Sequence, residues 1–473
     1  MKTNPEKTTL QITKRWIAAL ADTSMIVVLV AGLPSRESAV AAEPGSAGQA
    51  ARQRLTACDD IIKVIDIAPV WPGHPVGFDL LTAGGRQYVA YYDAERQMTI
   101  ASRALNSKEW DIVKLPERVG WDSHNGIKMT IDAHGHLHVV GNHHNHPLRY
   151  FRTEKAGDIQ TLKRVPEMVG RDEKRISSER WWRGPNDTML FAYRDGRSGD
   201  GRNIVNIYDP DNRRWERLLD KPLFDGRGRR NAYHSNPKLG PDGKFHMLWV
   251  WRENPNAETT HSLSYGRSPD LKQWETGAGE PYKLPLTLEN SGKVADIKQR
   301  QGFSSWRLGF DFQDRPIVTY NRFDQEGNTQ AYAARLEGGE WVQYQISNWD
   351  SRWEFRGRGS IGSSVRIGGV ERDERHGLTV SIQHRKEGSF RWVLNEESLK
   401  PVRKLDGVEI PAAIMLLESD HPGMNVRTVR ESADDGLTYV LRWETLSSNR
   451  DRPRPSSEVP KPEMLRLFKV KLE

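Results

Sequence analysis

Short apolar stretches separated by turns rich in Asp and Gly fill the chain from about residue 60 onwards. Some alternate apolar with polar residues, and others, such as residues 88–92 and 247–251, are almost wholly apolar. The first pattern is typical of a half-buried β-strand and the second of a strand buried on both faces. No stretch in this part of the chain has a convincing amphipathic helical period. The pattern predicts an all-β protein.

The predicted strands recur as a unit of two strands around an Asp/Gly turn, a third strand bearing Tyr or Arg, and then a Trp. Seven copies can be traced: residues 77–110, 124–165, 181–215, 231–274, 303–341, 360–402, and a last copy that contains 438–443 and ends with 465–470. Radial repetition of such units is the pattern of a propeller. We therefore expect a seven-bladed β-propeller. The alternative, a pair of β-sandwiches, predicts no regular repeat.

The N-terminal segment has the features of a secretory signal. Lys14 and Arg15 precede an apolar stretch, residues 16–33, and small residues follow at 39–42 in an A-x-A pattern. We expect residues 1–42 to be a signal peptide, 43–59 a linker, and 60–473 a single propeller domain. An uncleaved membrane anchor is the alternative, but Asp22 within the apolar stretch argues against it.

Composition narrows the environment and the partners. A single cysteine excludes an internal disulfide, and no later stretch is apolar enough to span a bilayer. We expect a secreted or periplasmic monomer that does not contact the membrane after signal cleavage. The formal net charge of +7 favours polyanions, and an exported protein seldom meets nucleic acid. The expected partner is an acidic polysaccharide or oligosaccharide, with no nucleic-acid partner.

A histidine-rich hairpin between residues 121 and 150 is the strongest candidate site. His124 and Asn125 open its first strand, and His144 follows its second. The turn at residues 132–135 is tight, so the far ends of the two strands should meet and bring His124 and His144 together. Zinc is a minority interpretation, because no Cys or acidic ligand accompanies these histidines at a familiar spacing. We predict no cofactor and no catalytic metal, with a structural metal ion still possible.

Other candidates come from comparing the copies. His138 and His246 hold the same place in two copies, which favours an architectural role satisfied by backbone hydrogen bonds. Tyr233 and His234 open the fourth copy as His124 and Asn125 open the second, so we expect them to face the same region. Arg252 lies in an apolar strand and must find a partner, such as Glu253 or a ligand carboxylate.

Several motifs resemble a known family. The segment Ser268-Pro269-Asp270 before Trp274 is similar to the Asp-box of BNR-repeat, sialidase-like propellers. Further segments resemble the carbohydrate-active propeller family that includes ulvan lyases and related rhamnosidases: residues 122–125, 144–150, 193–196, 251–253 and 349–359. The resemblance covers nearly the whole mature chain and implies a propeller that acts on carbohydrate.

The resemblance implies β-elimination at a uronic acid, with the family's paired histidines at His124 and His144 and its acid–base tyrosine at Tyr193. Such a reaction needs donors that neutralise the uronate carboxylate and a base for the C5 proton. Arginine suits the carboxylate because its fork binds it in a bidentate manner. We add Tyr233 to the catalytic candidates. The predicted substrate contacts are Asn125, Arg194, His234, Arg252, Arg322 and Arg352.

One departure from the family pattern concerns the reaction. The lyases have an arginine on the strand after the tyrosine, whereas here residues 203–208 contain none and Arg202 only precedes them. Arg194 or Arg252 could replace it. Three functions remain open: a polysaccharide lyase, a glycoside hydrolase of the same propeller family, and a non-catalytic glycan-binding propeller.

Overall fold

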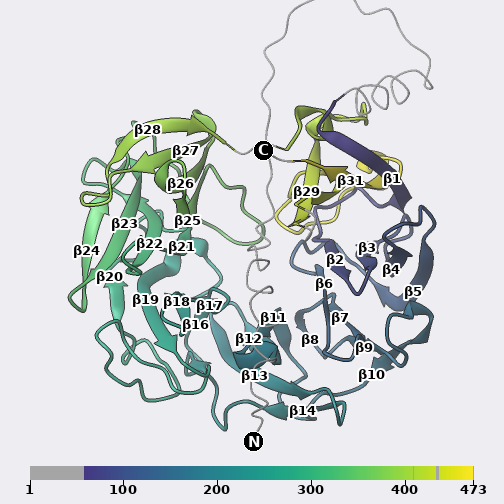
Figure 1. The fold of residues 1–473 in the computed structure, drawn as a ribbon, viewed down its shortest axis with the longest axis horizontal. Helices are drawn as coiled ribbons and strands as arrows, with labels where there is room; N and C mark the ends of the chain where they lie inside the picture. The colour runs from purple at the N-terminus through teal and green to yellow at the C-terminus, as the bar shows by residue number, and fades with distance from the viewer. Residues whose placement is uncertain (1–57, 408–409, 433–435, 472–473) are drawn as a thin grey trace, which may run out of the picture. The chain divides into compact units, whose positions relative to one another are not determined.

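The computed structural model describes residues 58–407, 410–432 and 436–471. The predicted signal peptide and nearly all of the predicted linker lie outside the described residues. Within the described ranges the regular elements are β-strands and five single-turn 3₁₀ helices. No helix there is long and apolar enough to cross a membrane. The strands form seven sheets, as the repeat predicts, and the fold class is that of a seven-bladed β-propeller (Figure 1).

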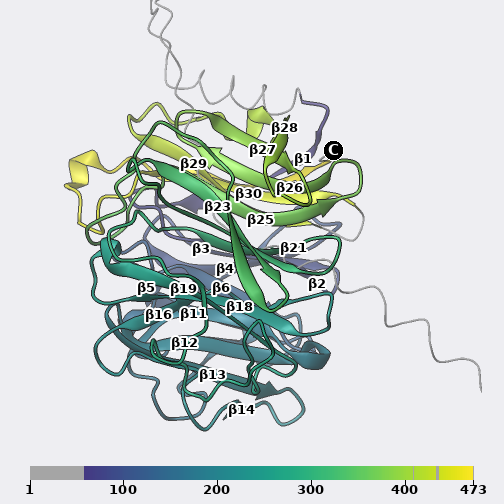
Figure 2. The same cartoon turned by 90° about the vertical axis from the view of Figure 1, so that its left-hand side faces the viewer.

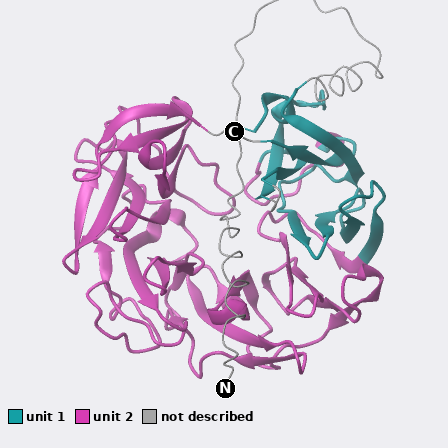
Figure 3. Ribbon diagram, in the orientation of Figure 1, with its two compact units in different colours: residues 1–114, 409–447, 459–473 teal, residues 115–408, 448–458 magenta. Residues whose placement is uncertain are grey.

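The chain divides into two compact units (Figure 3). Unit 1 comprises residues 1–114, 409–447 and 459–473, and unit 2 comprises residues 115–408 and 448–458. The first sheet of unit 1 contains β2 (Asp79–Ala83), β3 (Arg86–Tyr92), β4 (Gln97–Ala104) and β5 (Asp111–Arg118), which runs on past the boundary at residue 114. The second contains, in spatial order, β1 (Ile61–Val70), β31 (Glu463–Val470), β30 (Thr438–Leu446) and β29 (Met424–Ser432).

The second sheet of unit 1 combines the first and last described strands. β1 pairs antiparallel with β31 in a register that places Val64 opposite Phe468 and Val70 opposite Glu463. Phe468 and Val470 pack with Val440 and with Ile414 of the 3₁₀ turn Ala412–Met415. The repeat pattern did not predict that β1 belongs to this sheet, because pairing between distant strands leaves no local signal.

Unit 2 holds five sheets in chain order, except that β8 (His144–His146) precedes β9 (Tyr150–Thr153) but belongs to the second sheet (Figure 2). The first three contain β6 (Ile127–Ile131), β7 (Leu137–Gly141), β9 (Tyr150–Thr153) and β10 (Leu162–Val165); β8 (His144–His146), β11 (Ile176–Arg183), β12 (Met189–Arg197), β13 (Asp200–Asp209), β14 (Arg214–Arg217) and β15 (Phe224–Asp225); and β16 (Asn231–His234), β17 (Lys238–Leu239), β18 (Phe245–Arg252), β19 (Thr260–Ser268) and β20 (Lys293–Ala295). The last two contain β21 (Trp306–Phe310), β22 (Pro316–Phe323), β23 (Thr329–Glu337) and β24 (Glu340–Gln345); and β25 (Val365–Asp373), β26 (Gly377–His384), β27 (Gly388–Leu394) and β28 (Pro401–Asp406). The remaining 3₁₀ turns of the unit are Ile159–Thr161, Pro185–Asp187, Ala257–Thr259 and Ser456–Glu458.

The unbroken apolar runs have a direct structural reason in this unit. Successive side chains of a strand point to opposite faces of its sheet. In β18, Trp249 and Trp251 pack against Leu190 and Val205 of the preceding sheet. Leu248 and Val250 pack on the other side against residues of the following sheet, including Tyr320. A strand between two stacked sheets therefore buries both faces, as in a propeller.

Two recurrent motifs are architectural. His138 and His246 are buried, and each ring bonds an aspartate and a tyrosine: Asp132 and Tyr150, and Asp242 and Tyr265. The expected backbone hydrogen bonds are thus replaced by side-chain partners. The Asp-box turn is also present, because Asp270 accepts hydrogen bonds from the backbone N–H groups of Lys272 and Gln273 at 2.8 Å.

Candidate active site

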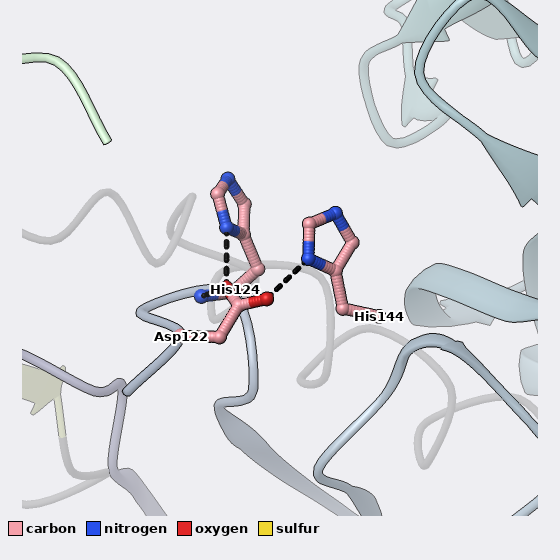
Figure 4. A group of neighbouring side chains, drawn as sticks. All are labelled: Asp122, His124 and His144. Carbon is pink, nitrogen blue, oxygen red and sulfur yellow. Dashed lines mark hydrogen bonds and ion pairs between the residues drawn. The ribbon is translucent and has the colours of Figure 1, made fainter. Parts of the chain in front are cut away.

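One carboxylate joins the two histidines that the hairpin was expected to bring together (Figure 4). His124 and His144 face each other, with ring centroids 4.5 Å apart. The Nδ1 of His124 lies 2.7 Å from Oδ1 of Asp122, and the Nδ1 of His144 bonds to its Oδ2. All three side chains are partly exposed, His124 by 49%. A substrate can therefore reach this triad, Asp122–His124–His144.

The two imidazoles stabilise the ionised carboxylate of Asp122, which in turn stabilises the charged form of His124. Burial would raise the pKa of Asp122, but the hydrogen bonds and charges of the two histidines lower it well below its usual range. Burial would likewise lower the pKa of His124, but Asp122, with a smaller contribution from Asp451, raises it. An ionised carboxylate can only accept, so both Nδ1 atoms carry hydrogen and both Nε2 atoms are left for a substrate.

A second carboxylate reaches the triad from a distant part of the chain. Asp451 belongs to residues 448–458, the excursion between β30 and β31 that is part of unit 2. Its Oδ1 accepts hydrogen bonds from the N–H and hydroxyl of Ser123, and its Oδ2 lies 3.7 Å from Nδ1 of His124. Ser360 donates its backbone N–H to the same Oδ2 at 3.1 Å. Asp451 thus fixes the turn that carries His124.

Buried polar groups fix the backbone of the loop that carries His144. His143 accepts a hydrogen bond at Nε2 from the backbone N–H of Arg149, at 2.7 Å. Its Nδ1 lies 3.4 Å from the buried carboxylate of Glu179. The backbone N–H of Asn145, a residue with φ of 63°, donates to Ser177 Oγ at 2.8 Å. Since this backbone is fixed on both sides of His144, the imidazole has a defined position.

Tyr233 on β16 lies between two arginines. The Cζ of Arg252 is 4.4 Å from the tyrosine ring centroid, and that of Arg194 is 5.4 Å away. The hydroxyl is 2.8 Å from Ser198 Oγ and accepts a hydrogen bond from Arg252 Nη1 at 3.3 Å. Burial would raise the pKa of Tyr233, but the charges of Arg252 and Arg194 outweigh it and lower the pKa to about 8.

The tyrosine group and the triad belong to one electrostatic neighbourhood. The negative charge of ionised Tyr233 contributes to raising the pKa of His124. Arg194 has room beside Tyr233 because Gly201, on the neighbouring strand, has no side chain: a Cβ there would lie 2.6 Å from Arg194 Cδ. The predicted residues thus form two groups, His124 with His144 and Tyr233 with Arg194 and Arg252.

Tyr193 does not have the position that the resemblance implied. Its side chain has 0% exposure and packs among Val140, Phe191 and other core residues. Its hydroxyl accepts a hydrogen bond from Arg217 Nη1 at 2.9 Å, and burial raises its pKa. A buried phenol with a raised pKa cannot take a proton from a polymer. The structure therefore places Tyr193 in the core and not where the resemblance implied, in contact with a substrate.

His234 is also a core residue rather than a substrate contact. It is buried against Trp182 and Phe224, with ring centroids 5.4 and 5.5 Å from its own. Its Nδ1 bonds the carbonyl of Ser235 at 2.9 Å. Burial, with the charge of Arg180, lowers the pKa of His234 to about 3, so the ring is neutral. His234 ends strand β16, whereas Asn125 lies in the turn before β6, so the expected correspondence between them is wrong.

The other predicted contacts are engaged locally. Asn125 is buried and donates its backbone N–H to the carbonyl of Asp122, so it supports the turn. Arg322 lies over the ring of Tyr332, 4.6 Å from its centroid. Arg352 pairs with Glu354 at 2.6 Å and lies over Phe323.

Arg252 and Arg202 bind partners that the sequence analysis did not name. Arg252 does not pair with Glu253: its Nε donates to Thr260 Oγ1 at 2.8 Å, and Glu253 instead binds Arg230 and His261. Arg202 is committed to Asp195 and Asp172. Arg194 and Arg252 are thus the arginines beside a tyrosine with a lowered pKa.

The triad also has the composition of a metal site. One potential ligand atom from each of Asp122, His124 and His144 lies within 4.8 Å of the others, and imidazole and carboxylate together suit a divalent transition metal. The sequence did not reveal an acidic ligand, because Asp122, His124 and His144 do not have a conventional metal-ligand spacing. Nothing in the sequence indicates Asp451, since only the fold brings it near His124.

Three solved structures are similar to this chain over most of its length. The polysaccharide lyase Uly1 superposes with a TM-score of 0.58 at 12% identity, covering 88% of this chain and 100% of that one. An ulvan lyase of a new polysaccharide lyase family gives 0.54 at 12% identity, covering 86% and 96%. The same kind of lyase bound to -[GlcA(1-4)Rha3S]- gives 0.53 at 12% identity. At this identity the likeness concerns the fold.

Sequence comparison gives the family. No curated protein matches the chain. A family model described as "BNR repeat-containing family member" matches residues 86–349, more than half of the chain, including the triad, Tyr233 and the Asp-box. The chain belongs to the BNR repeat-containing family.

Proposed function

We propose that this protein is a polysaccharide lyase that cleaves an anionic, uronate-containing glycan by β-elimination. One observation carries the proposal: Arg194 and Arg252 lie against Tyr233 and lower its pKa to about 8, and the charge of Tyr233 contributes to raising the pKa of His124. Tyrosine is a base only when its pKa approaches the working pH, and such shifts cluster at functional sites.

The reaction follows from these groups. Arg252, with Arg194 behind it, binds the uronate carboxylate and withdraws charge from it, which makes the C5 proton more acidic. The Tyr233 phenolate removes that proton, and the C5–H electron pair forms the C4–C5 double bond. The bond from C4 to the glycosidic oxygen breaks at the same time. The products are a 4,5-unsaturated uronate and a new hydroxyl end.

His124 is the best placed acid for the leaving oxygen. Asp122 raises the pKa of His124, so the imidazolium persists nearer neutral pH and can donate its Nε2 proton. His144, held by the same carboxylate, offers a second Nε2 to the sugar. Site environments that push the pKa values of two groups in opposite directions are how enzymes assign the base and acid roles. Here the base is a tyrosine and the acid a histidine.

The comparisons and the chain's charge support the substrate class. The similar structures include polysaccharide lyases, one of them bound to a glucuronate–rhamnose sulfate. The formal charge of +7 favours a polyanion. A secreted or periplasmic location, as the predicted signal suggests, would give the protein access to such a polymer. We propose that the protein works there.

Glycoside hydrolysis is the second candidate, because Asp122 and Asp451 place two carboxylates beside His124. Hydrolases usually need such a pair, one as acid and the other as base or nucleophile. However, both oxygens of Asp122 bind histidines, and those of Asp451 bind Ser123 and Ser360. Carboxylates occupied in this way serve better to position their neighbours than to react.

A panel of uronate-containing glycans distinguishes the possibilities. We expect ultraviolet absorbance from a 4,5-unsaturated uronate to rise in step with new reducing ends. New reducing ends without that absorbance would overturn elimination in favour of hydrolysis. Saturable binding without cleavage of any glycan in the panel would leave a non-catalytic binding module.

A further inference from the structure

A cleft of about 270 Å³ includes the start of β19 and none of the triad residues. Its lining combines two lysines with a histidine and a serine: His261, Ser262, Leu288, Lys293, Asp296 and Lys298. Ser262 has φ of 54°, an unusual backbone conformation for a non-glycine residue, and such positions gather at functional sites. Nothing in the proposed elimination uses these residues.

The cleft adjoins the proposed active site through the edge of one sheet. Arg252, at the end of β18, is paired with Thr260, at the start of β19, and His261 is the next residue. Glu253, which follows Arg252, accepts hydrogen bonds from Arg230 at 2.8 Å and from His261 at 2.7 Å. Glu253 and His261 thus connect Arg252 to the lining of the cleft.

The two lysines of the cleft are positioned as a pair. Lys293 Nζ lies 3.0 Å from Oδ1 of Asp296, and Lys298 Nζ bonds Oδ2 of the same carboxylate. One carboxylate balances only one of two ammonium groups, so a net positive charge remains. Each ammonium has three hydrogens and gives one to Asp296, which leaves donors from both lysines for an anion.

We propose that this cleft is a second carbohydrate subsite that binds an anionic sugar, carrying a carboxylate or a sulfate, of the chain being cleaved at Tyr233. The inference rests on the proposed function and deepens it by naming what the site recognises beyond the reacting uronate. The volume lies near the small end of the range for ligand sites, about 300–1,000 Å³, which suits one sugar residue rather than a long segment.

Binding is measured in the Tyr233→Phe background, so that the glycan stays intact. The probes are polyglucuronate, a sulfated glucuronate–rhamnose polymer, and a carboxyl-reduced neutral polymer. The test variant is Lys293→Ala with Lys298→Ala. The matched control is Lys221→Ala with Lys272→Ala, which removes two exposed lysines elsewhere in unit 2. We expect the test variant to bind at least one charged polymer roughly 3- to 30-fold more weakly, and the control to change little.

The results separate this inference from the elimination. Affinity for both charged polymers equal to that of the parent would overturn the subsite, and so would an equal loss for the neutral polymer. Weaker binding of a charged polymer supports the subsite even if no unsaturated product forms, in which case only the proposed reaction fails. If elimination occurs, Lys293→Ala with Lys298→Ala in the protein that keeps Tyr233 should raise KM and leave kcat nearly unchanged. An unchanged KM would overturn the subsite while the reaction stands.

Discussion

The guanidinium of Arg252 lies over the ring of Tyr233, with Nη1 3.3 Å from the tyrosine hydroxyl. The pair couples the charge of one side chain to the acidity of the other. A phenol in this position ionises more readily because its anion faces a fixed cation. The acidity of Tyr233 is therefore a property that substitution of Arg252 can alter.

Replacing Arg252 by Met should raise the pKa of Tyr233 from about 8 toward or beyond its ordinary value, about 10. The basic rise of the pH–rate profile, where the phenolate forms, should move to higher pH by the same amount. Tyrosinate absorbance, taken as the difference from a Tyr233→Phe variant, measures the pKa directly. Arg252→Lys keeps the charge but loses the fork, so it should restore part of the pKa shift while still impairing kcat/KM. An unmoved titration in Arg252→Met would contradict the coupling.

Replacing Asp122 by Asn should lower the pKa of His124, because the carboxylate is what raises it. Titration of the histidine ring protons by NMR, assigned with a His124→Gln variant, measures the shift. His124 has a raised pKa in the folded state, so its contribution to stability is present below about pH 6.5 and is lost as pH rises through the folded value. Asp122 has a lowered pKa, so its contribution is lost as pH falls below about 4.

The advantage of the parent over Asp122→Asn in unfolding free energy should thus be largest between these two limits. Denaturant unfolding at several pH values tests it. A difference that stays constant from pH 3 to 9 would argue against the Asp122–His124 ion pair.

Tyr233→Phe and Tyr193→Phe remove the same atom from two environments and should differ in their effect on turnover. Loss of the Tyr233 hydroxyl should reduce turnover by about 10²–10⁴-fold, the usual contribution of a positioned base. Loss of the Tyr193 hydroxyl leaves Arg217 without one acceptor and should cost about 1 kcal/mol of stability with turnover retained. Initial rates and denaturant unfolding are measured on both variants. A large loss of turnover in Tyr193→Phe alone would restore the assignment made from the sequence.

The buried pair of His143 and Glu179 should be needed to fold the loop that carries His144. Removing one partner of a buried polar contact leaves the other group unsatisfied, which typically costs about 1–3 kcal/mol, so His143→Ala should be destabilised. Burial would raise the pKa of Glu179, but its interaction with His143 lowers it. Its contribution to stability is therefore present above about pH 4.3 and is lost as pH falls through the folded pKa.

The isostere Glu179→Gln should be less stable than the parent at pH 7, and the two should converge in acid. Thermal unfolding at pH 7 and pH 4 measures both. Equal stability of the two proteins at pH 7 would show that the pair contributes no net energy.

Sequence patterns predicted the blades and the histidine pair because both depend on local features. Each blade repeats a strand–turn–strand pattern, and a tight turn between two strands fixes which ends meet, so His124 and His144 could be placed together. Tyr193 was misplaced because a strand buried on both faces does not reveal which side chains face the core. Asp451 could not be foreseen, since residues 448–458 leave one unit and join the other.

The tyrosine with the useful acidity is likewise a three-dimensional property. Tyr233 differs from Tyr193 in that two arginines, from β12 and β18, lie against its ring and lower its pKa. Comparing the copies singled out Tyr233 by position, but it also singled out His234, which is structural. The charges around a side chain, and not its position in a repeat, decide its chemistry.

The pairing of β1 with β31 also determines when the sheet that contains both strands can form during folding. During synthesis β1 emerges long before β31, so the sheet they share cannot close until nearly the whole chain is available. Until then β1 presents unpaired N–H and C=O groups, which can pair with another chain. A chain truncated before Glu463 would keep that edge open, so late termination products should aggregate rather than persist as soluble fragments.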